Sequence, residues 1–232
     1  MAVDLDDQRE QVLRALVAAM RGGTAARSKL LGVKGEALAA ATAENRSVRA
    51  AATRPAIERY TGVLYDALDV GTLPAAARRR LGSSVLIVSG LWGLVAPTDA
   101  IPAYKLKMGA SLGRLGRLST WWREPLTGAL TAVARGRTVW NLLPKEHDAA
   151  WSAPDDLAQT SVEFLEPGRG GELVAVAHWN KLLKGALVRH LLEHPGTTPD
   201  GLRDWEHPLG FRMDPGRTRT AGARTVVSLV RA

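Results

Sequence analysis

Apolar side chains recur at helical spacing through the first third of the chain. Val12, Leu16 and Met20 follow one another at intervals of four residues behind an acidic stretch, and Gly22 comes soon after them. This pattern predicts an amphipathic helix that ends before the glycine. An Ala-rich second helix is expected over residues 35–49 and a third over residues 57–68. The first third is therefore predicted to be helical throughout.

Short β-branched runs begin in the middle of the chain. Residues 84–89 form one such run and residues 137–143 form another, and runs of this length suit buried strands. Between them, the apolar positions of residues 121–134 have the spacing of a packed helix. The order of strand, helix and strand favours a parallel crossover.

The last third alternates strands, a helix and loops. Residues 160–165 and 173–177 flank a glycine-rich loop, which indicates an antiparallel hairpin. A helix is expected over residues 182–193 and a final strand over residues 225–230. The whole pattern predicts an α/β fold of mixed α+β type, in which helices flank a mixed sheet. We expect a single domain over residues 1–232, with a helical section at residues 8–50.

Composition places the chain among globular proteins. Its 232 residues are 46% hydrophobic and 23% charged, close to the averages of folded domains. The lack of cysteine excludes disulfides, thiol nucleophiles and metal sites that need thiolate. The longest apolar stretch, residues 85–97, is shorter than the ~20 residues of a membrane span, and the chain begins with acidic residues. We therefore expect a cytoplasmic protein that does not contact membranes.

The charge balance indicates a class of partner. The chain has 31 lysine and arginine residues against 23 acidic ones, which gives a formal net charge of +8. A surplus of this sign favours polyanions, nucleic acid first, through long-range attraction and counterion release. A high-GC bacterial proteome that uses much arginine is the alternative origin of this surplus.

The most unusual segment is SGLWGLVAPTDAIPAYKLKMG, which begins at Ser89 and ends at Gly109. Its prolines and glycines follow a predicted strand, so we expect an ordered but irregular loop, a kind of place where functional side chains are often presented. A buried structural turn packed by Trp92 and Tyr104 is the alternative.

This segment resembles the bacterial peroxide stress protein YaaA family in an actinobacterial form. Further likeness comes from the string YTGVLY at residues 60–65, the helix that carries Trp122, the pair Asn141-Leu142 followed by Glu146, and residues 181–185. The match runs from about residue 6 to residue 231. The resemblance implies a single-domain α/β fold with a helix-hairpin-helix element, DNA binding, and protection against peroxide damage by limiting free iron.

A candidate for the helix-hairpin-helix turn consists of Gly32, Val33, Lys34 and Gly35. Backbone N–H groups at such a turn hold phosphate, because unpaired donors and partial positive charge coincide at a helix N-terminus. The second glycine comes one residue late here, so Lys34 either adds a phosphate contact or disturbs the turn. An ordinary helical hairpin is the alternative.

Further cations between residues 105 and 137 are candidates to complete a groove for DNA. The candidate nucleic-acid-binding residues among them are Lys105, Lys107, Arg114, Arg117 and Arg123. We expect DNA to be the partner, bound without strong sequence preference. A solvated basic face is the alternative.

The sequence departs from the family in two places. Relatives usually begin with a strand that ends in a Lys-bearing loop containing proline, whereas this chain opens on the next helix. Either the family's N-terminal strand is absent or the start has been truncated, and we expect a pocket that depends on that loop to be incomplete. The second departure is Lys107, where relatives often carry an acidic or small residue.

An enzyme of small-molecule metabolism is the alternative function. Tyr104, Lys105, Asn141, Glu146 and Lys181 offer a phenol, amines, an amide and a carboxylate, which are groups that a site for a phosphate-bearing or carbonyl substrate uses. The sequence has no nucleophile motif, phosphate-binding loop or dinucleotide fingerprint. We expect no cofactor.

A small anionic ligand is a second candidate partner, at the predicted helix near residue 181. Lys181 and Lys184 are three residues apart on one face, and Arg189 lies about 80° from Lys181 around the helix. His190 and His194 also share a face, but two ligands do not make a site, so we expect no metal. The seven tryptophans are predicted as core residues, with base stacking as the alternative.

Overall fold

A computed structural model describes residues 4–176 and 179–231 and divides the chain into two compact units. The first unit holds residues 1–59, 85–133 and 143–153, and the second holds residues 60–84, 134–142 and 154–232. Among the described residues, no helix has both the length and the apolar character needed to cross a bilayer. The prediction of a single domain stays a prediction.

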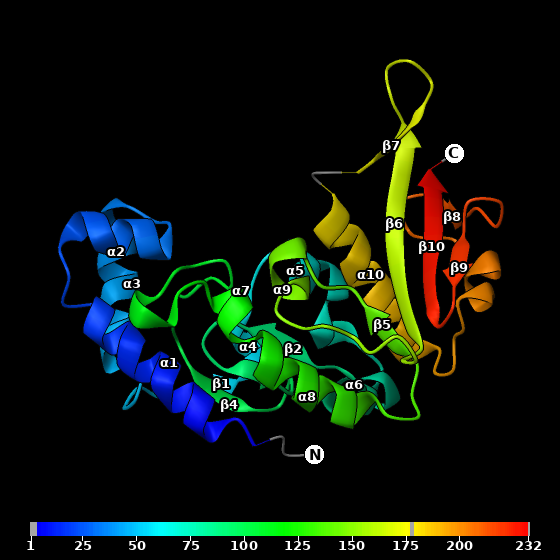
Figure 1. Cartoon of the computed structure of the whole chain (residues 1–232). Helices are drawn as coiled ribbons and strands as arrows, with labels where there is room; N and C mark the ends of the chain where they lie inside the picture. Colours follow the sequence, from blue (N-terminus) through cyan, green and yellow to red (C-terminus); the bar gives the residue numbers. More distant parts are fainter. Residues whose placement is uncertain (1–3, 177–178, 232) are drawn as a thin grey trace. The chain divides into compact units, whose positions relative to one another are not determined.

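The first unit is mainly helical (Figure 1). Its helices are α1 (Asp6–Ala19), α2 (Thr24–Leu31), α3 (Gly35–Ser47), α4 (Ala56–Arg59), the 3-10 helix η2 (Gly113–Leu115), α7 (Leu118–Trp121), α8 (Arg123–Ala134) and α9 (Lys145–Asp148). Its strands form two antiparallel pairs, β1 (Thr53–Pro55) with β4 (Ala100–Pro102) and β2 (Ile87–Ser89) with β3 (Gly93–Val95).

Polar contacts join the N-terminal helices of this unit. Glu10 of α1 pairs with Arg49, just beyond α3, at 2.8 Å and with Arg14 of its own helix. The hydrogen bond from Arg49 and then the one from Arg14 lower the pKa of Glu10 to about 2. Arg46 of α3 donates to the carbonyl oxygen of Met20, just after α1, at 2.9 Å. The pairs Glu10–Arg49 and Met20–Arg46 therefore hold α1 against the end of α3.

A buried amide holds the chain that follows β4. Asn45 of α3 is fully buried, and its Oδ1 accepts the N–H of Lys105 while its Nδ2 donates to the carbonyl oxygen of Lys105, each at 2.9 Å. The next residues alternate as in an extended chain: Lys105 and Lys107 are exposed, whereas Leu106 and Met108 are buried. The amide thus decides which side chains of this segment reach solvent.

Gly93 leaves room for Trp122 in the core beside β2 and β3. The indole N–H of Trp122 donates to the carbonyl oxygen of Gly90 at 3.0 Å. Its ring fills the space that a Cβ at Gly93 would occupy, with ring atoms 2.6 to 3.0 Å from that position, and Gly93 has a φ of 70°. A side chain at Gly93 would therefore displace the ring and strain the backbone.

The second unit is built on a mixed six-stranded sheet within the described residues (Figure 1). Its strands are β5 (Val139–Asn141), β6 (Gln159–Pro167), β7 (Leu173–Ala175), β8 (Phe211–Met213), β9 (Arg219–Ala221) and β10 (Arg224–Arg231). The order is β5-β6-β10-β8, and β6 is parallel to both β5 and β10. β7 pairs antiparallel with β6, while β8 and β9 pair antiparallel with β10.

Helices pack beside this sheet and close its core. They are α5 (Val63–Leu68), the 3-10 helix η1 (Val70–Thr72), α6 (Ala75–Ser84), α10 (Asn180–Glu193) and the 3-10 helix η3 (Asp200–Asp204). Leu183 and Leu187 of α10 join Phe164 and Leu229 of the sheet in one buried cluster. Gly185 faces α5 so closely that a Cβ there would collide with the Leu64 carbonyl oxygen.

The structure confirms the mixed α/β fold with a mixed sheet flanked by helices. The predicted helices at residues 35–49 and 182–193, the hairpin of β6 with β7 and the final strand are confirmed as α3, α10, β6–β7 and β10. The hairpin prediction reached residue 177, which lies outside the described residues.

Three expectations about the first half are wrong. The helix expected over residues 57–68 is divided into α4 and α5, because Gly62 between them adopts a φ of 111°. The first third also contains strand β1. The parallel crossover is wrong, since β2 pairs antiparallel with β3, whereas β5 pairs with β6 in the other unit.

Replacing Asn45 by Ala should lower the free energy of unfolding by about 2–4 kcal/mol, because the N–H and C=O of Lys105 lose their partners inside the protein. Urea denaturation followed by circular dichroism measures this. Ser47→Ala, an exposed change on the same helix, is the control and should alter stability little. Equal loss in both variants would contradict the role given to the Asn45 amide.

Candidate functional site

A glycine turn joins α2 to α3 on the surface of the first unit. Gly32 and Gly35 have φ values of 69° and 57°, in the left-handed region that suits glycine. The Gly32 N–H closes α2 on the carbonyl oxygen of Ser28 at 2.8 Å, and the Ser28 hydroxyl donates to the carbonyl oxygen of Val33 at 2.8 Å. Val33 and Lys34 therefore lie between two positive-φ glycines in the connection from α2 to α3.

The start of α3 at this turn is open to a ligand. Lys34 is its N-cap and makes no side-chain capping hydrogen bond. Gly32, Lys34 and Gly35 are exposed and Val33 is half-buried. The first N–H groups of a helix have no carbonyl partner within the helix, and the helix dipole adds partial positive charge at the same point. The turn thus presents donors and a cation on one exposed surface.

Lys107 brings a second cation to the turn. Its ammonium group occupies the space that a Cβ at Gly32 would fill, so a side chain at position 32 would displace the ammonium from this place. Lys107 comes from the extended segment that Asn45 fixes, far from the turn in the sequence. Lys107, which is an expected difference from relatives, therefore lies in the same local structure as the glycine turn.

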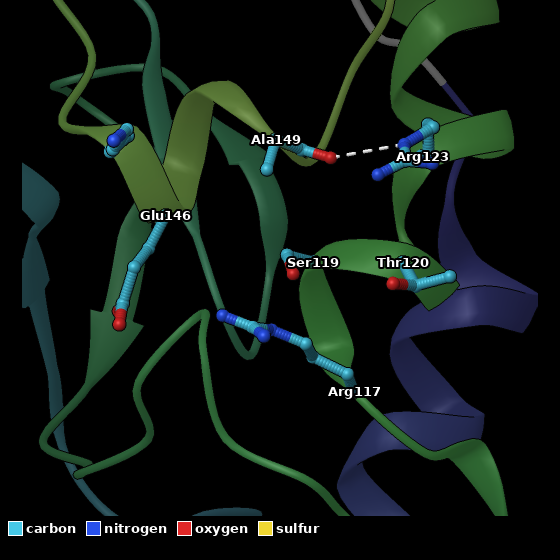
Figure 2. Close-up of a pocket in the computed structure, with 7 residues that line it drawn as sticks. Arg117, Ser119, Thr120, Arg123, Glu146 and Ala149 are labelled. Atoms are coloured by element: carbon cyan, nitrogen blue, oxygen red, sulfur yellow. Dashed lines mark hydrogen bonds between the residues drawn. The ribbon is translucent and has the colours of Figure 1, made fainter.

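The remaining predicted cations of this unit lie further along the chain. Arg114 is in η2, Arg117 immediately precedes α7, and Arg123 begins α8; all three are exposed, as is Lys105. The Nε of Arg123 donates to the carbonyl oxygen of Ala149 at 3.1 Å (Figure 2).

A hollow of about 330 Å³ lies at the start of α7 and α8 and beside α9. It is open to solvent, and Figure 2 shows the side chains that enter it. The residues that line it are Arg117, Ser119, Thr120, Arg123, Lys145, Glu146 and Ala149. The carboxylate of Glu146 lies against Gly109, where a Cβ would be only 2.7 Å from each carboxylate oxygen.

The central loop is organised by one buried hydroxyl. Ser89 Oγ accepts the N–H groups of Leu91 and Trp92 at 3.2 and 3.0 Å, and lies 2.6 Å from the hydroxyl of Tyr104. Trp92 meets Tyr104 edge to face, with ring centroids 6.2 Å apart. These contacts agree with the reading of the loop as a structural turn.

The residues of the alternative enzyme site are divided between the units. Tyr104, Lys105 and Glu146 belong to the first unit, and Asn141 and Lys181 to the second. Within the first unit, Tyr104 and Glu146 have different neighbours: the Tyr104 hydroxyl lies beside Ser89, while Glu146 lies beside Gly109.

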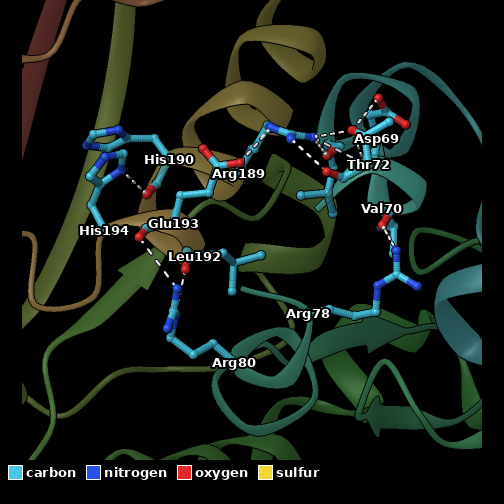
Figure 3. A network of polar contacts seen from close by, with 11 residues as sticks. Asp69, Val70, Thr72, Arg78, Arg80, Arg189, His190, Leu192, Glu193 and His194 are labelled. Carbon is cyan, nitrogen blue, oxygen red and sulfur yellow. Dashed lines mark hydrogen bonds and ion pairs between the residues drawn. The ribbon is translucent and has the colours of Figure 1, made fainter. Parts of the chain in front are cut away.

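Arg189 is part of a polar network that joins α10 to the segment after α5 (Figure 3). Its guanidinium donates to the carbonyl oxygens of Leu68, Asp69 and Thr72 at 3.2 to 3.3 Å and to the Thr72 hydroxyl at 2.9 Å. It also pairs with Glu193 at 3.0 Å. On the same helix, Lys181 is exposed and Lys184 is half-buried. Arg189 thus has a structural role that the sequence did not indicate.

The histidines at the end of α10 form a ring stack. His190 lies between His194 and Trp205, with ring centroids 4.4 and 4.6 Å away and interplanar angles of 27° and 23°. Burial, followed by the neighbouring charge of His194, lowers the pKa of His190 to about 4. Within the described part of the chain, no group of three or more His, Cys, Asp or Glu side chains is placed to hold a metal ion.

These features define a basic protein of mixed α/β fold, with an exposed glycine turn to which two lysines contribute. The chain belongs to the peroxide stress protein YaaA family, whose model matches residues 2–217.

Individual relatives are UPF0246 proteins. The chain is 42% identical over 216 residues to one from Streptomyces coelicolor, an alignment that covers 89% of this chain and 79% of the relative. It is 35% identical over 167 residues to one from Corynebacterium glutamicum and 32% identical over 178 residues to one from Dinoroseobacter shibae. Those alignments cover 70% and 72% of this chain but 64% and 65% of the relatives, so the chain matches less than two thirds of their length.

Sequence reasoning missed the residues that complete these sites. Asn45 is a polar residue within an Ala-rich helix, and its burial was the missing information. Ser119, Thr120 and Lys145 enter the hollow only because α7 and α9 lie beside each other there. A polar residue inside an apolar helical pattern is a sequence feature that could have indicated Asn45.

The stability of the protein should fall as the pH is lowered from 7 towards 4. His190 has a lowered pKa in the folded state, so between about 4 and 6.5 the unfolded chain binds a proton that the folded chain does not. The loss should be about 1 kcal/mol, because the ring is only half-buried. Urea denaturation at a series of pH values measures it, and His190→Gln should flatten the profile. A variant profile as steep as that of the unchanged protein would contradict this.

Proposed function

We propose that the first unit binds duplex DNA through its phosphates, without strong sequence preference. The observation that carries the proposal is the approach of the Lys107 ammonium to Gly32, on an exposed turn whose following helix has an uncapped N-terminus. Backbone donors and two lysines at one point suit a phosphodiester, which offers two charged oxygens.

In this proposal, the turn acts as a gripping point. The N–H groups at the start of α3 donate to one phosphate, while Lys34 and Lys107 neutralise its charge. Asn45 holds the backbone segment that carries Lys107. The exposed side chain of Lys107 therefore reaches the turn from a backbone that is held in place. Lys105, exposed two residues earlier, extends the positive charge along the same segment.

The arginines supply the weaker part of the interface. Arg114, Arg117 and Arg123 are exposed in the same unit and add to the positive field that attracts DNA. Contacts to phosphates position a protein on the duplex but carry no base information, so such an interface reads charge rather than sequence.

The family description suggests the setting of this activity. It names a peroxide stress protein, and we propose that DNA binding in the cytoplasm contributes to protection against peroxide. The enzyme of small-molecule metabolism, with Tyr104, Lys105, Asn141, Glu146 and Lys181 as its site, stays a prediction.

Salt titration of DNA binding tests the proposal. Fluorescence anisotropy with a labelled, 5′-unphosphorylated duplex should give a log–log plot of affinity against salt with a steep negative slope. Lys34→Gln and Lys107→Gln should each weaken binding and reduce the magnitude of that slope by about 1, because each removes one phosphate contact.

Arg79→Gln is the control, since this exposed arginine of α6 lies in the other unit. It removes the same charge and should leave most of the affinity intact. Binding that does not depend on salt would overturn the proposal, and so would lysine variants that lose no more affinity than Arg79→Gln.

A further inference from the structure

The hollow beside α7 and α9 holds an unusual set of charges. Arg117, Arg123 and Lys145 line it, and none of the three forms an ion pair with any described residue. Arg123 uses its Nε for the Ala149 carbonyl oxygen, which leaves its two terminal amino groups available. Three cations with no internal counterion thus face one space.

A serine hydroxyl that lines the same hollow lacks a partner among the described residues. Ser119 is only 3% exposed, and its hydroxyl makes no hydrogen bond with any residue in the described ranges. Thr127 of α8, in contrast, donates to the carbonyl oxygen of Arg123 at 2.6 Å. Ser119 is the second residue of α7, so no helical carbonyl lies four residues before it. The oxygen reaches the open space of the hollow, so a ligand oxygen there would accept the hydrogen bond that no described residue accepts.

Glu146 adds an acceptor to the hollow. Its carboxylate lies against Gly109 and makes no hydrogen bond or ion pair with any residue that the structure describes. A carboxylate in a site for a bare phosphate would repel the ligand. The same carboxylate favours a ligand that carries hydroxyl groups next to its phosphate, because paired hydroxyls donate to a carboxylate.

We propose that this hollow binds a phosphate monoester of a pentose. Arg117, Arg123 and Lys145 neutralise the dianionic phosphate, the Ser119 hydroxyl donates to one of its oxygens, and Glu146 accepts from the sugar hydroxyls. The volume of about 330 Å³ is at the lower end of the ~300–1,000 Å³ of ligand sites, which suits one sugar phosphate. The inference goes beyond DNA binding, in which Arg117 and Arg123 only add to the positive field, because it gives the Ser119 hydroxyl and the Glu146 carboxylate a ligand of their own.

Isothermal titration calorimetry on the full chain tests the proposal with ribose 5-phosphate, ribose and inorganic phosphate as probes. Ribose 5-phosphate should bind saturably, and both ribose and inorganic phosphate should bind at least roughly tenfold more weakly, because each lacks one half of the contacts. Equal binding of inorganic phosphate and ribose 5-phosphate would overturn the role of Glu146. If ribose 5-phosphate does not bind, and a terminal phosphate on DNA does not bind either, the whole proposal is overturned.

Single substitutions test the contribution of each side chain to the binding of ribose 5-phosphate. Arg117→Gln should weaken ribose 5-phosphate about tenfold, whereas Arg21→Gln, the same change at another exposed arginine of this unit, should not. Ser119→Ala removes a hydroxyl that has no partner among the described residues, so it should weaken binding several-fold without lowering the melting temperature. Glu146→Gln should weaken ribose 5-phosphate but not inorganic phosphate. Losses equal to that of Arg21→Gln would contradict the assignment.

Two further ligands identify the source of the sugar phosphate. Tight binding of a nucleoside 5′-monophosphate would indicate a free metabolite, and a preference for 5′-phosphorylated over unphosphorylated duplex that Ser119→Ala abolishes would indicate a strand end. Either result supports the proposal, and failure of both overturns it. Lys34→Gln and Lys107→Gln should leave ribose 5-phosphate binding unchanged, so failure of the DNA proposal and failure of this one are distinguishable.

Discussion

Two hydrogen bonds of the buried Asn45 amide, one donated and one accepted, hold the segment that carries Lys105 and Lys107. The amide pairs with both backbone groups of Lys105, as a neighbouring strand would, although it is a side chain of a helix. Because the backbone is fixed there, Leu106 and Met108 point inward and Lys105 and Lys107 outward. The basic character of the glycine turn therefore depends on a neutral residue that makes no contact with solvent.

The fold was predictable where the pattern is long and local. α1 and α10 each have 14 residues with apolar positions at helical spacing, and the β6–β7 hairpin follows from its glycine-rich loop. The crossover prediction failed because β2 pairs with β3, the next strand along the chain, and β5 pairs with β6. Gly93 begins β3 with a positive φ and leaves room for the ring of Trp122, and such packing leaves no periodic trace in the sequence.

The candidate site was predictable in its components but not in its assembly. The glycine turn and Lys107 were each visible in the sequence, the latter as a departure from the family. Lys107 and Gly32 are 75 positions apart in the sequence, and residues 60–84 of the chain between them belong to the second unit, so spacing cannot indicate that the two residues meet. Ser119 carried even less information, because a serine beside a threonine has nothing unusual until its burial and lack of a partner are known.

The two anion-binding features proposed for the first unit differ in how much opposing charge they hold. The turn presents backbone donors and lysines with no carboxylate among residues 32–35, although Glu36 follows in the first turn of α3, so in the proposal it discriminates little between phosphates. The hollow sets Glu146 beside three cations, which would penalise an anion that brings no hydrogen-bond donors of its own. Unselective and selective binding of phosphates would therefore require different amounts of opposing charge. The glycine at position 109 leaves room for the carboxylate of Glu146, which lies against it.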